Sequence, residues 1–223
     1  MPSLAYRLKD ALYLNITNRC PCDCSFCLRG TWDTIGDADS LWLDHEPNAN
    51  EVIEAIKVAM GCEQTVGVMS SSPACDEALT SPQSGELSEI VYCGFGEPFS
   101  SYEVMLDVAR WLKAQVPTPR IRVNTNGLGD LINGRPTAPE LEGLVDALSI
   151  SLNAPTPEEY VQLCNPVFGL DALPAIISFA KQAKRYVSEV TFTVVSILTP
   201  EQLEACRAVA AEAGIPLRIR EQV

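Results

Sequence analysis

Short apolar runs alternate along this chain with longer segments in which apolar residues recur every three or four positions. The short runs predict β-strands, and the periodic segments predict α-helices that bury one face. The predicted strands are residues 12–17, 89–93, 121–124, 148–152, 190–198 and 216–220. The predicted helices are residues 47–60, 102–115, 139–147, 157–163, 170–186 and 200–213.

This alternation of strand and helix is typical of parallel β/α units built on one sheet. A right-handed series of such units curls toward a barrel, and a complete barrel of this kind has eight units. Six predicted strands therefore favour an α/β fold, a partial, open-sided (β/α)6 TIM-like barrel. The chain has 223 residues, 47% of them hydrophobic, so we expect one domain over residues 1–223.

Residues 61–86 interrupt the alternation between the first predicted helix and the second predicted strand. The segment is rich in Ser, Pro and Gly, contains Cys62 and Cys75, and shows little periodicity. This composition is typical of a surface insertion. Two thiols without other ligand-type residues nearby are poor evidence for a second metal site.

Charge and hydropathy narrow the functions to consider. The formal net charge is −13, whereas a nucleic-acid surface needs clustered Lys and Arg, so we expect no nucleic-acid partner. No apolar run approaches the ~18–20 residues of a membrane span, and residues 1–10 lack the apolar stretch of a secretory signal. We therefore expect a cytoplasmic protein without a membrane partner, in which nine cysteines favour metal ligation or isolated thiols over disulfides.

Four cysteines lie close together in T-N-R-C-P-C-D-C-S-F-C, directly after the first predicted strand. Cys20, Cys24 and Cys27 have the spacing Cys-x3-Cys-x2-Cys. Cysteine normally holds all four irons of a 4Fe–4S cluster, so a loop that supplies three leaves one iron free for a small-molecule ligand. The alternative is structural zinc on all four thiols, but with Cys22 the set is too tight for paired zinc knuckles. We expect Cys22 to turn its side chain away.

Polar residues also collect where the other predicted strands end. The ends carry C-G-F-G-E-P at residues 93–98, N-T-N-G at 124–127, S-L-N-A-P at 151–155 and R-I-R-E at 218–221. In α/β barrels the catalytic groups come from the carboxyl ends of the strands. These groups and the cysteine loop should therefore converge on one rim.

Together these motifs resemble the radical S-adenosylmethionine (radical SAM) superfamily. The resemblance rests on the cysteine spacing with Phe26 before the third cysteine, on G-E-P after the second strand and on T-N-G after the third. It runs from Tyr13 to Arg220. The fuller pattern, with N-I-T-N-R-C, W-L-D-H-E-P, S-I-S-L-N-A-P and L-R-I-R-E, is most similar to the short TatD-associated radical SAM proteins.

The resemblance implies two cofactors, a 4Fe–4S cluster and S-adenosylmethionine. Cys20, Cys24 and Cys27 would hold three irons, and the methionyl amine and carboxylate would chelate the fourth. Reductive cleavage would give methionine and a 5′-deoxyadenosyl radical, which abstracts hydrogen from a substrate. The implied partners are a small-molecule or peptide substrate, which the sequence does not identify, and an external one-electron donor of the flavodoxin or ferredoxin type.

The resemblance also places cofactor contacts on matching positions. Phe26 would lie near the adenine, and Glu97 would accept a hydrogen bond from the methionyl ammonium. Ser151 and Asn153 are candidates for the carboxylate and ribose, with Asn126 beside them. These residue types suit the cofactor, because a carboxylate attracts its cationic groups and neutral side chains can bind its carboxylate and hydroxyls. No residue is assigned as catalytic.

Arg218 and Arg220 alternate on the last predicted strand and so share one face. That face would either contact an anionic substrate or the cofactor carboxylate, or be the solvated side of an edge strand. Residues 29–46 are a candidate cover for the site, with His45 at the surface. We expect Cys93, Cys164 and Cys206 to serve mainly in packing.

The chain departs from the family pattern in one motif. Many members have two glycines before the glutamate, whereas this chain has Phe95-Gly96, for which Gly94 could compensate. The sequence shows no cysteine-rich C-terminal extension, so one cluster is expected. Other functions stay open: an activator that places a radical on a glycine of a partner enzyme, an enzyme that rearranges a pterin-like ring, a non-cleaving iron–sulfur electron-transfer or binding protein, and a zinc-stabilised structural protein.

Overall fold

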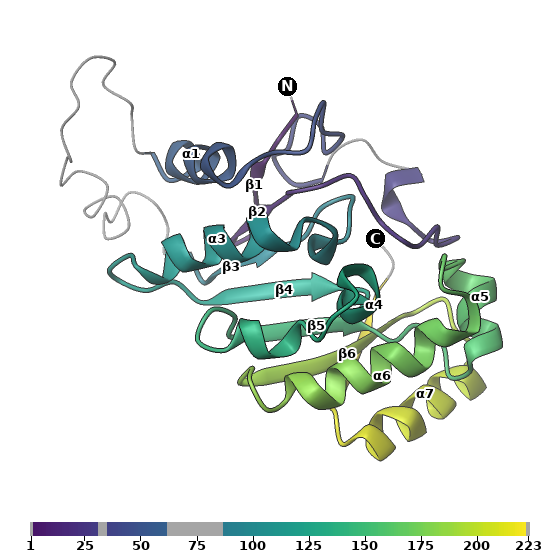
Figure 1. Ribbon diagram of the computed structural model, residues 1–223. Coiled ribbons are helices and arrows are strands. Elements are labelled where there is room, and N and C mark those ends of the chain that lie inside the picture. The colour runs from purple at the N-terminus through teal and green to yellow at the C-terminus, as the bar shows by residue number, and fades with distance from the viewer. Residues whose placement is uncertain (1, 31–34, 62–86, 222–223) are drawn as a thin grey trace, which may run out of the picture.

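The computed structural model describes residues 2–30, 35–61 and 87–221 (Figure 1). One seven-stranded sheet, in the order β1-β2-β3-β4-β5-β6-β7, organises the molecule. Its strands are β1 Ala5–Leu8, β2 Ala11–Leu14, β3 Glu89–Tyr92, β4 Ile121–Thr125, β5 Ala147–Ser151, β6 Glu189–Val195 and β7 Leu217–Arg220. β1 pairs antiparallel with β2, and every later neighbour pairs in parallel.

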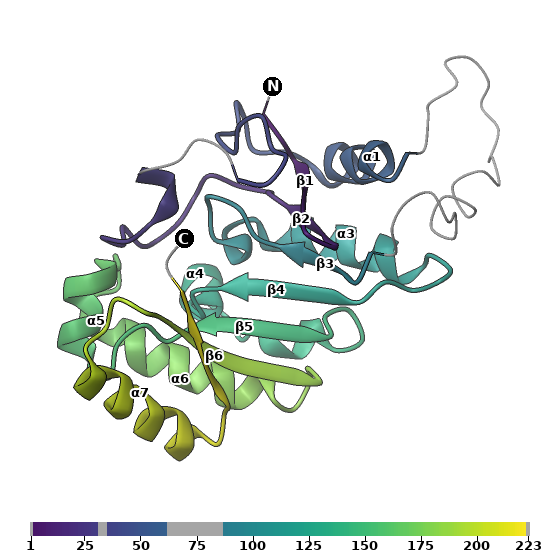
Figure 2. The same ribbon diagram turned by 180° about the vertical axis from the view of Figure 1, so that it is seen from behind.

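Helices connect the parallel strands. The α-helices are α1 Ala49–Ala59, α3 Tyr102–Lys113, α4 Gly129–Asn133, α5 Pro157–Cys164, α6 Ala172–Ala183 and α7 Pro200–Ala213. Short 3-10 turns are η1 Leu28–Gly30, η2 Pro98–Ser101, η3 Ala138–Leu141 and η4 Gly169–Asp171. The long helices lie on one face of the sheet, and none of the helices in the described ranges covers the opposite face (Figures 1 and 2). The predicted α/β fold, a partial and open-sided barrel, is confirmed.

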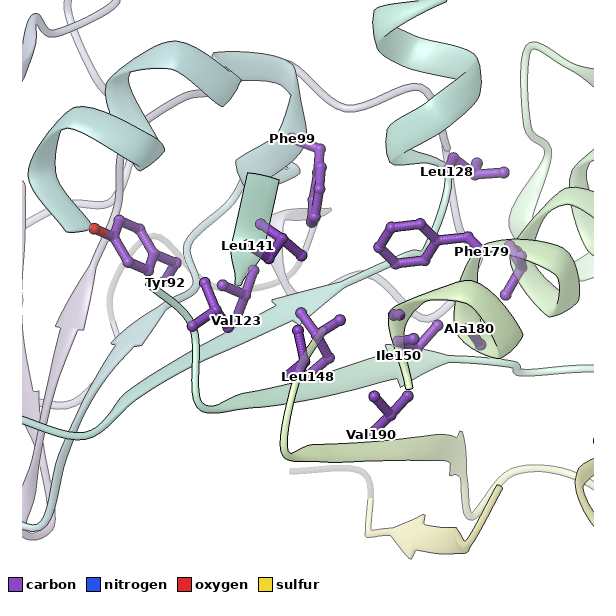
Figure 3. Close-up of a cluster of buried hydrophobic side chains, with 14 of the residues drawn as sticks. Tyr92, Phe99, Val123, Leu128, Leu141, Leu148, Ile150, Phe179, Ala180 and Val190 are labelled. Carbon is purple, nitrogen blue, oxygen red and sulfur yellow. The ribbon is translucent and has the colours of Figure 1, made fainter. Parts of the chain in front are cut away.

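The main core lies between the sheet and its helices (Figure 3). Alternate residues of β3, β4 and β5 point into it, among them Tyr92, Val123 and Leu148. Phe179 of α6 meets the Phe99 ring edge-on at a centroid distance of 5.5 Å. Because strand side chains alternate between faces, the residues between these apolar positions project onto the face without helices.

Several elements differ from the predictions. The predicted helix at 139–147 is only the turn η3, because Gly143 takes a left-handed φ of +71° and β5 already begins at Ala147. β1 and the short helix α4 were not predicted. The predicted insertion at 61–86, with Cys62 and Cys75, lies outside the described residues except for Gly61.

Among the described helices, none is by itself long and apolar enough to span a membrane. The helical segments Pro157–Cys164 and Gly169–Ala183 reach that length and composition only together, and the chain bends by 109° between them.

Candidate active site

The cysteine loop follows β2 and is fastened to the end of α5. Backbone N–H groups of Asp23 and Ser25 donate to the carbonyls of Cys164 and Leu163, both at 3.0 Å. These carbonyls belong to the last turn of α5 and have no partner within the helix. The helix end therefore fixes the path of the loop at the carboxyl edge of the sheet.

Three of the loop's thiols lie side by side. Cys20 interacts with Cys22, and this contact together with burial raises the pKa of the Cys20 thiol. Contact with Cys20 lowers the pKa of Cys22, but its contact with Cys24 and its burial outweigh this and raise it to about 12. The expectation that Cys22 turns away is wrong. Its side chain is buried, and Asn126 Nδ2 donates to its sulfur at 3.8 Å.

Glu97 lies buried where β3 ends, 3% exposed. Its Oε1 accepts from Thr125 Oγ1 at 2.7 Å and from the Phe99 N–H at 3.2 Å, and its Oε2 accepts from the Asn126 N–H at 2.7 Å. Burial raises the pKa of Glu97 to about 7 even though these donors lower it. No cationic side chain of the described residues forms an ion pair with it.

Glycines on both sides of Phe95 allow this larger residue to stand where many members of the resembled family have glycine. A Cβ on Gly94 would lie 2.0 Å from Asn15 Oδ1, and a Cβ on Gly96 would lie 2.2 Å from the carbonyl oxygen of Thr17. Both positions therefore need glycine so that the turn can pack against the end of β2. Phe95 is buried in a separate small cluster, and its ring centroid lies 5.0 Å from that of Trp42. The larger side chain is thus accommodated away from these two close approaches.

Asn126 and Asn153 bring the ends of β4 and β5 to the same cysteine loop. Besides its contact with Cys22, Asn126 uses Oδ1 to accept from the Leu128 N–H at 2.9 Å. Asn153 takes a left-handed φ of +57°, which costs energy in a residue other than glycine. Its Nδ2 donates to Cys164 Sγ at 3.7 Å, while its buried Oδ1 has no partner.

The remaining predicted residues lie around this rim. Ser151 is half-buried at the end of β5, and Phe26 is half-buried against the main core. Arg218 and Arg220 are exposed on β7, and Arg218 Nη2 donates to Ser149 Oγ on β5 at 3.2 Å. This bond places the two arginines on the face of the sheet that has no helices.

The end of the predicted cover is fastened to the rim. Glu46 accepts from Thr17 Oγ1 at 2.7 Å and from Ser101 Oγ at 3.0 Å, and it pairs with Arg19 at 3.1 Å. Burial would raise the pKa of Glu46, but these donors lower it below its ordinary value. His45 is exposed, as expected, and contacts Glu51 at 2.8 Å.

Sequence reasoning missed three residues that support the rim. Thr125 binds Glu97, Tyr160 lies buried against Cys22, and Cys164 contacts both Asn153 and Cys24. Cys164 is buried, as predicted, but it is not merely a packing residue. Thr125 stands inside N-T-N-G, so the motif itself was the signal that could have found it. Tyr160 and Cys164 carry no local signal, since only tertiary packing brings α5 to the loop.

The residues present fit the implied cofactors in three respects. The loop supplies three soft thiolate ligands, which suit an iron–sulfur cluster. Glu97 is a buried carboxylate that lacks a cation, and Asn153 offers a buried oxygen that lacks a donor. A bound ammonium and hydroxyl would satisfy both groups. Within the described parts of the chain, no three Cys, His, Asp or Glu side chains already form a metal-binding set.

Comparisons with known proteins agree with these features. No family model matches the chain. Over 161 residues, 70% of the chain, it is 27% identical to a protein named "Probable dual-specificity RNA methyltransferase RlmN" from Bifidobacterium adolescentis. It is 28% identical over the same length to the protein of that name from Bifidobacterium longum. The matched region spans only 35% of either relative.

Two solved structures share the fold. A radical SAM methyltransferase from Sphaerobacter thermophilus superposes with a TM-score of 0.51 at 18% identity, covering 97% of this chain and 68% of that one. Streptococcus suis SuiB, bound to its precursor peptide SuiA, superposes with a TM-score of 0.55 at 12% identity, covering 93% of this chain and 38% of that one. The solved structures thus share the fold of this chain, and the sequence relatives are named as RNA methyltransferases.

Proposed function

We propose that this protein is a radical SAM enzyme with one 4Fe–4S cluster. The observation that carries the proposal is a continuous set of interactions between three strand ends and the cysteine loop. Glu97 at the end of β3 interacts with Cys20, and Asn126 after β4 contacts Cys22. Asn153 after β5 contacts Cys164, which in turn contacts Cys24. Residues far apart in sequence thus gather at one rim around the thiols.

In this proposal Cys20, Cys24 and Cys27 hold the cluster. When bound and reduced, such a cluster would supply the electron for cleavage of S-adenosylmethionine. Glu97 binds and orients the cationic methionyl group, and its burial strengthens that attraction. Asn153 offers its unpaired Oδ1 as an acceptor.

Other groups at the rim position these residues or cover them. Thr125 and the Asn126 N–H fix the carboxylate of Glu97 before any ligand arrives. Ser151 and Phe26 complete the cofactor contacts in this proposal. Residues 31–34 of the predicted cover lie outside the described residues, and in this proposal residues 35–46 help to exclude water, which would protect a reactive intermediate from side reactions.

The finer assignments are also part of this proposal. The motifs favour the TatD-associated subgroup. The proposal also includes a cytoplasmic location, a single domain and an external one-electron donor. The curated relatives are named as RNA methyltransferases, and the chain spans about a third of their length. With a net charge of −13, this chain is poorly suited to RNA, so we favour a small-molecule or peptide substrate.

The decisive experiment is anaerobic reconstitution with iron and sulfide, followed by reduction and addition of S-adenosylmethionine. The proposal expects formation of 5′-deoxyadenosine and methionine. Cys24→Ala should abolish both products, whereas Cys206→Ala, at a buried thiol on α7, should retain them. An intact cluster that yields no 5′-deoxyadenosine would reject the proposal and favour an electron-transfer or binding protein.

A further inference from the structure

Two arginines of β7 point into the interior of the curved sheet. Arg220 interacts electrostatically with the Cys93 thiol, which lies at the end of β3. β7 and β3 are four strands apart, about 19 Å in a flat sheet at the usual strand spacing. Because electrostatic attraction weakens with distance, this interaction indicates that the sheet curls and brings β7 toward the end of β3. Arg218 lies on the same face and bonds to Ser149 of β5.

Neither arginine has a carboxylate partner within the part of the chain that the structure describes. Arg122, on the same inner face, is paired with Glu89 at 2.6 Å. Arg218 donates to a neutral hydroxyl, and Arg220 faces a thiol. This contrasts with the composition, in which 29 acidic residues outnumber 16 basic ones. Acidic partners are thus plentiful in the sequence, yet the described structure brings none to this pair.

The arrangement is unfavourable for the protein alone. Burial lowers the pKa of the Arg220 guanidinium, the nearby Cys93 thiol opposes this effect, and repulsion from Arg218 lowers it further. Two like charges side by side on one face, without a carboxylate partner among the described residues, attract a compensating charge. An anion supplied from outside the chain would provide it, and the planar guanidinium fork matches a carboxylate or phosphate.

The position of the pair indicates what this anion belongs to. The Cys93 thiol interacts electrostatically with both Arg220 and Glu97 of the rim. The arginines thus lie on the inner face of the barrel next to the proposed cofactor site. We propose that Arg218 and Arg220 form an anion subsite for the substrate, which is a small molecule carrying a carboxylate or a phosphate. This inference rests on the proposed function for its identification of the substrate.

Anion binding itself can be measured on the full chain without turnover. Inorganic phosphate and succinate should each raise the thermal unfolding midpoint of the wild-type protein by about 3–5 °C beyond KCl of equal ionic strength. The double variant Arg218→Gln/Arg220→Gln should lose this shift. Arg207→Gln removes an arginine on the exposed side of α7 and should keep it. Equal shifts in all three proteins, or none in the wild type, would overturn the inference.

The variants also separate an anion site from a structural role. Without added anion, the double variant should unfold at the same temperature as the wild type or up to about 4 °C higher, since mutual repulsion is removed. A clear fall in the midpoint would assign the arginines to folding and overturn the inference. Arg220→Gln alone, which keeps the Arg218–Ser149 bond, guards against misfolding of the double variant and should already weaken the response to phosphate.

Titration with S-adenosylmethionine distinguishes the substrate from the cofactor carboxylate. The half-saturating concentration for 5′-deoxyadenosine formation in the double variant should match that of Arg207→Gln. A tenfold or larger rise would assign the pair to the cofactor and overturn the inference. If phosphate or succinate binds at the pair but no 5′-deoxyadenosine forms, the anion subsite stands and the proposed function fails. Cleavage without anion binding would support the proposed function and overturn the anion subsite.

Discussion

At the scale of single residues, the rim combines groups that are costly to bury. Glu97 is ionisable and buried, and Asn153 has a strained backbone and an unpaired buried oxygen. Folding alone would favour apolar or paired side chains at such places. Groups of this kind gathered at one edge of a sheet are typical of a binding site.

The buried carboxyl should make stability depend on pH. The pKa of Glu97 rises from 4.5 to about 7 on folding, so its contribution to the free energy of unfolding is fully present below pH 4.5 and is lost as the pH rises through 7. Between pH 5 and pH 8 the wild type should therefore lose on the order of 3 kcal/mol of unfolding free energy, and Glu97→Gln should not show this loss. Urea unfolding of the metal-free protein at both pH values measures this. Glu142→Gln, at an exposed glutamate, should keep the wild-type slope, and an unchanged slope in Glu97→Gln would contradict the assignment.

Cys22 and Cys24 test the ligand assignment. After anaerobic reconstitution, Cys24→Ala should lose most of the about four irons expected per chain of the wild type, because a cluster ligand is gone. Cys22→Ala should keep them, and it should be destabilised by about 1 kcal/mol through lost packing in the core. Iron and sulfide analysis of both proteins measures the difference. Equal losses would mean that the contact of Cys22 with its neighbours reflects a ligand role.

At the scale of elements, the close contact between the end of β2 and the turn after β3 positions Glu97. That contact is possible because Gly94 and Gly96 have no side chains, so Asn15 and Thr17 can lie directly against them. The sequence showed the two glycines and the family's usual pattern. It could not show that Phe95 between them packs into a second cluster.

Substitution at Gly96 should disturb this contact strongly. In Gly96→Ala the new Cβ would lie 2.2 Å from the Thr17 carbonyl oxygen, so we expect a loss of about 3 kcal/mol or more in unfolding free energy. Gly134→Ala is the matched control. Its φ of +63° is unfavourable for alanine but no atom lies within 4 Å, so it should cost only about 1 kcal/mol. Chemical denaturation compares the two, and equal costs would argue against a tight contact.

At the scale of the whole molecule, two separate hydrophobic clusters stabilise two different regions of the described structure. The large one joins the sheet to its helices, and the small one joins Tyr6, Ala38, Leu41 and Phe95. The small cluster fastens residues 35–43 to the N-terminal hairpin, on the edge of the barrel. Opening of this segment should therefore need less free energy than global unfolding.

Phe95→Ala should separate these two levels of stability. Removing the ring takes away much of the small cluster's packing. Dilute protease under native conditions should therefore cleave within residues 35–43 at least tenfold faster than in the wild type. Leu148→Ala, in the main core, should instead lower global stability by about 2–5 kcal/mol. Cleavage rates and mapped sites distinguish the two. Uniform cleavage across the chain in Phe95→Ala would show that the clusters are not independent.

The sequence by itself determined the six parallel strands, most of the helices, the open-sided barrel and the cysteine loop with its neighbouring motifs. These features are local, since periodicity and spacing depend on neighbouring residues. Tertiary structure alone decided that Cys22 points inward and that Thr125 holds Glu97. It also decided that Cys164 and Tyr160 of α5 contact the loop's cysteines, and that Arg218 of β7 bonds to Ser149 of β5. Each of these facts depends on how strongly the sheet curls and on which strand ends meet, and no stretch of neighbouring residues encodes that geometry.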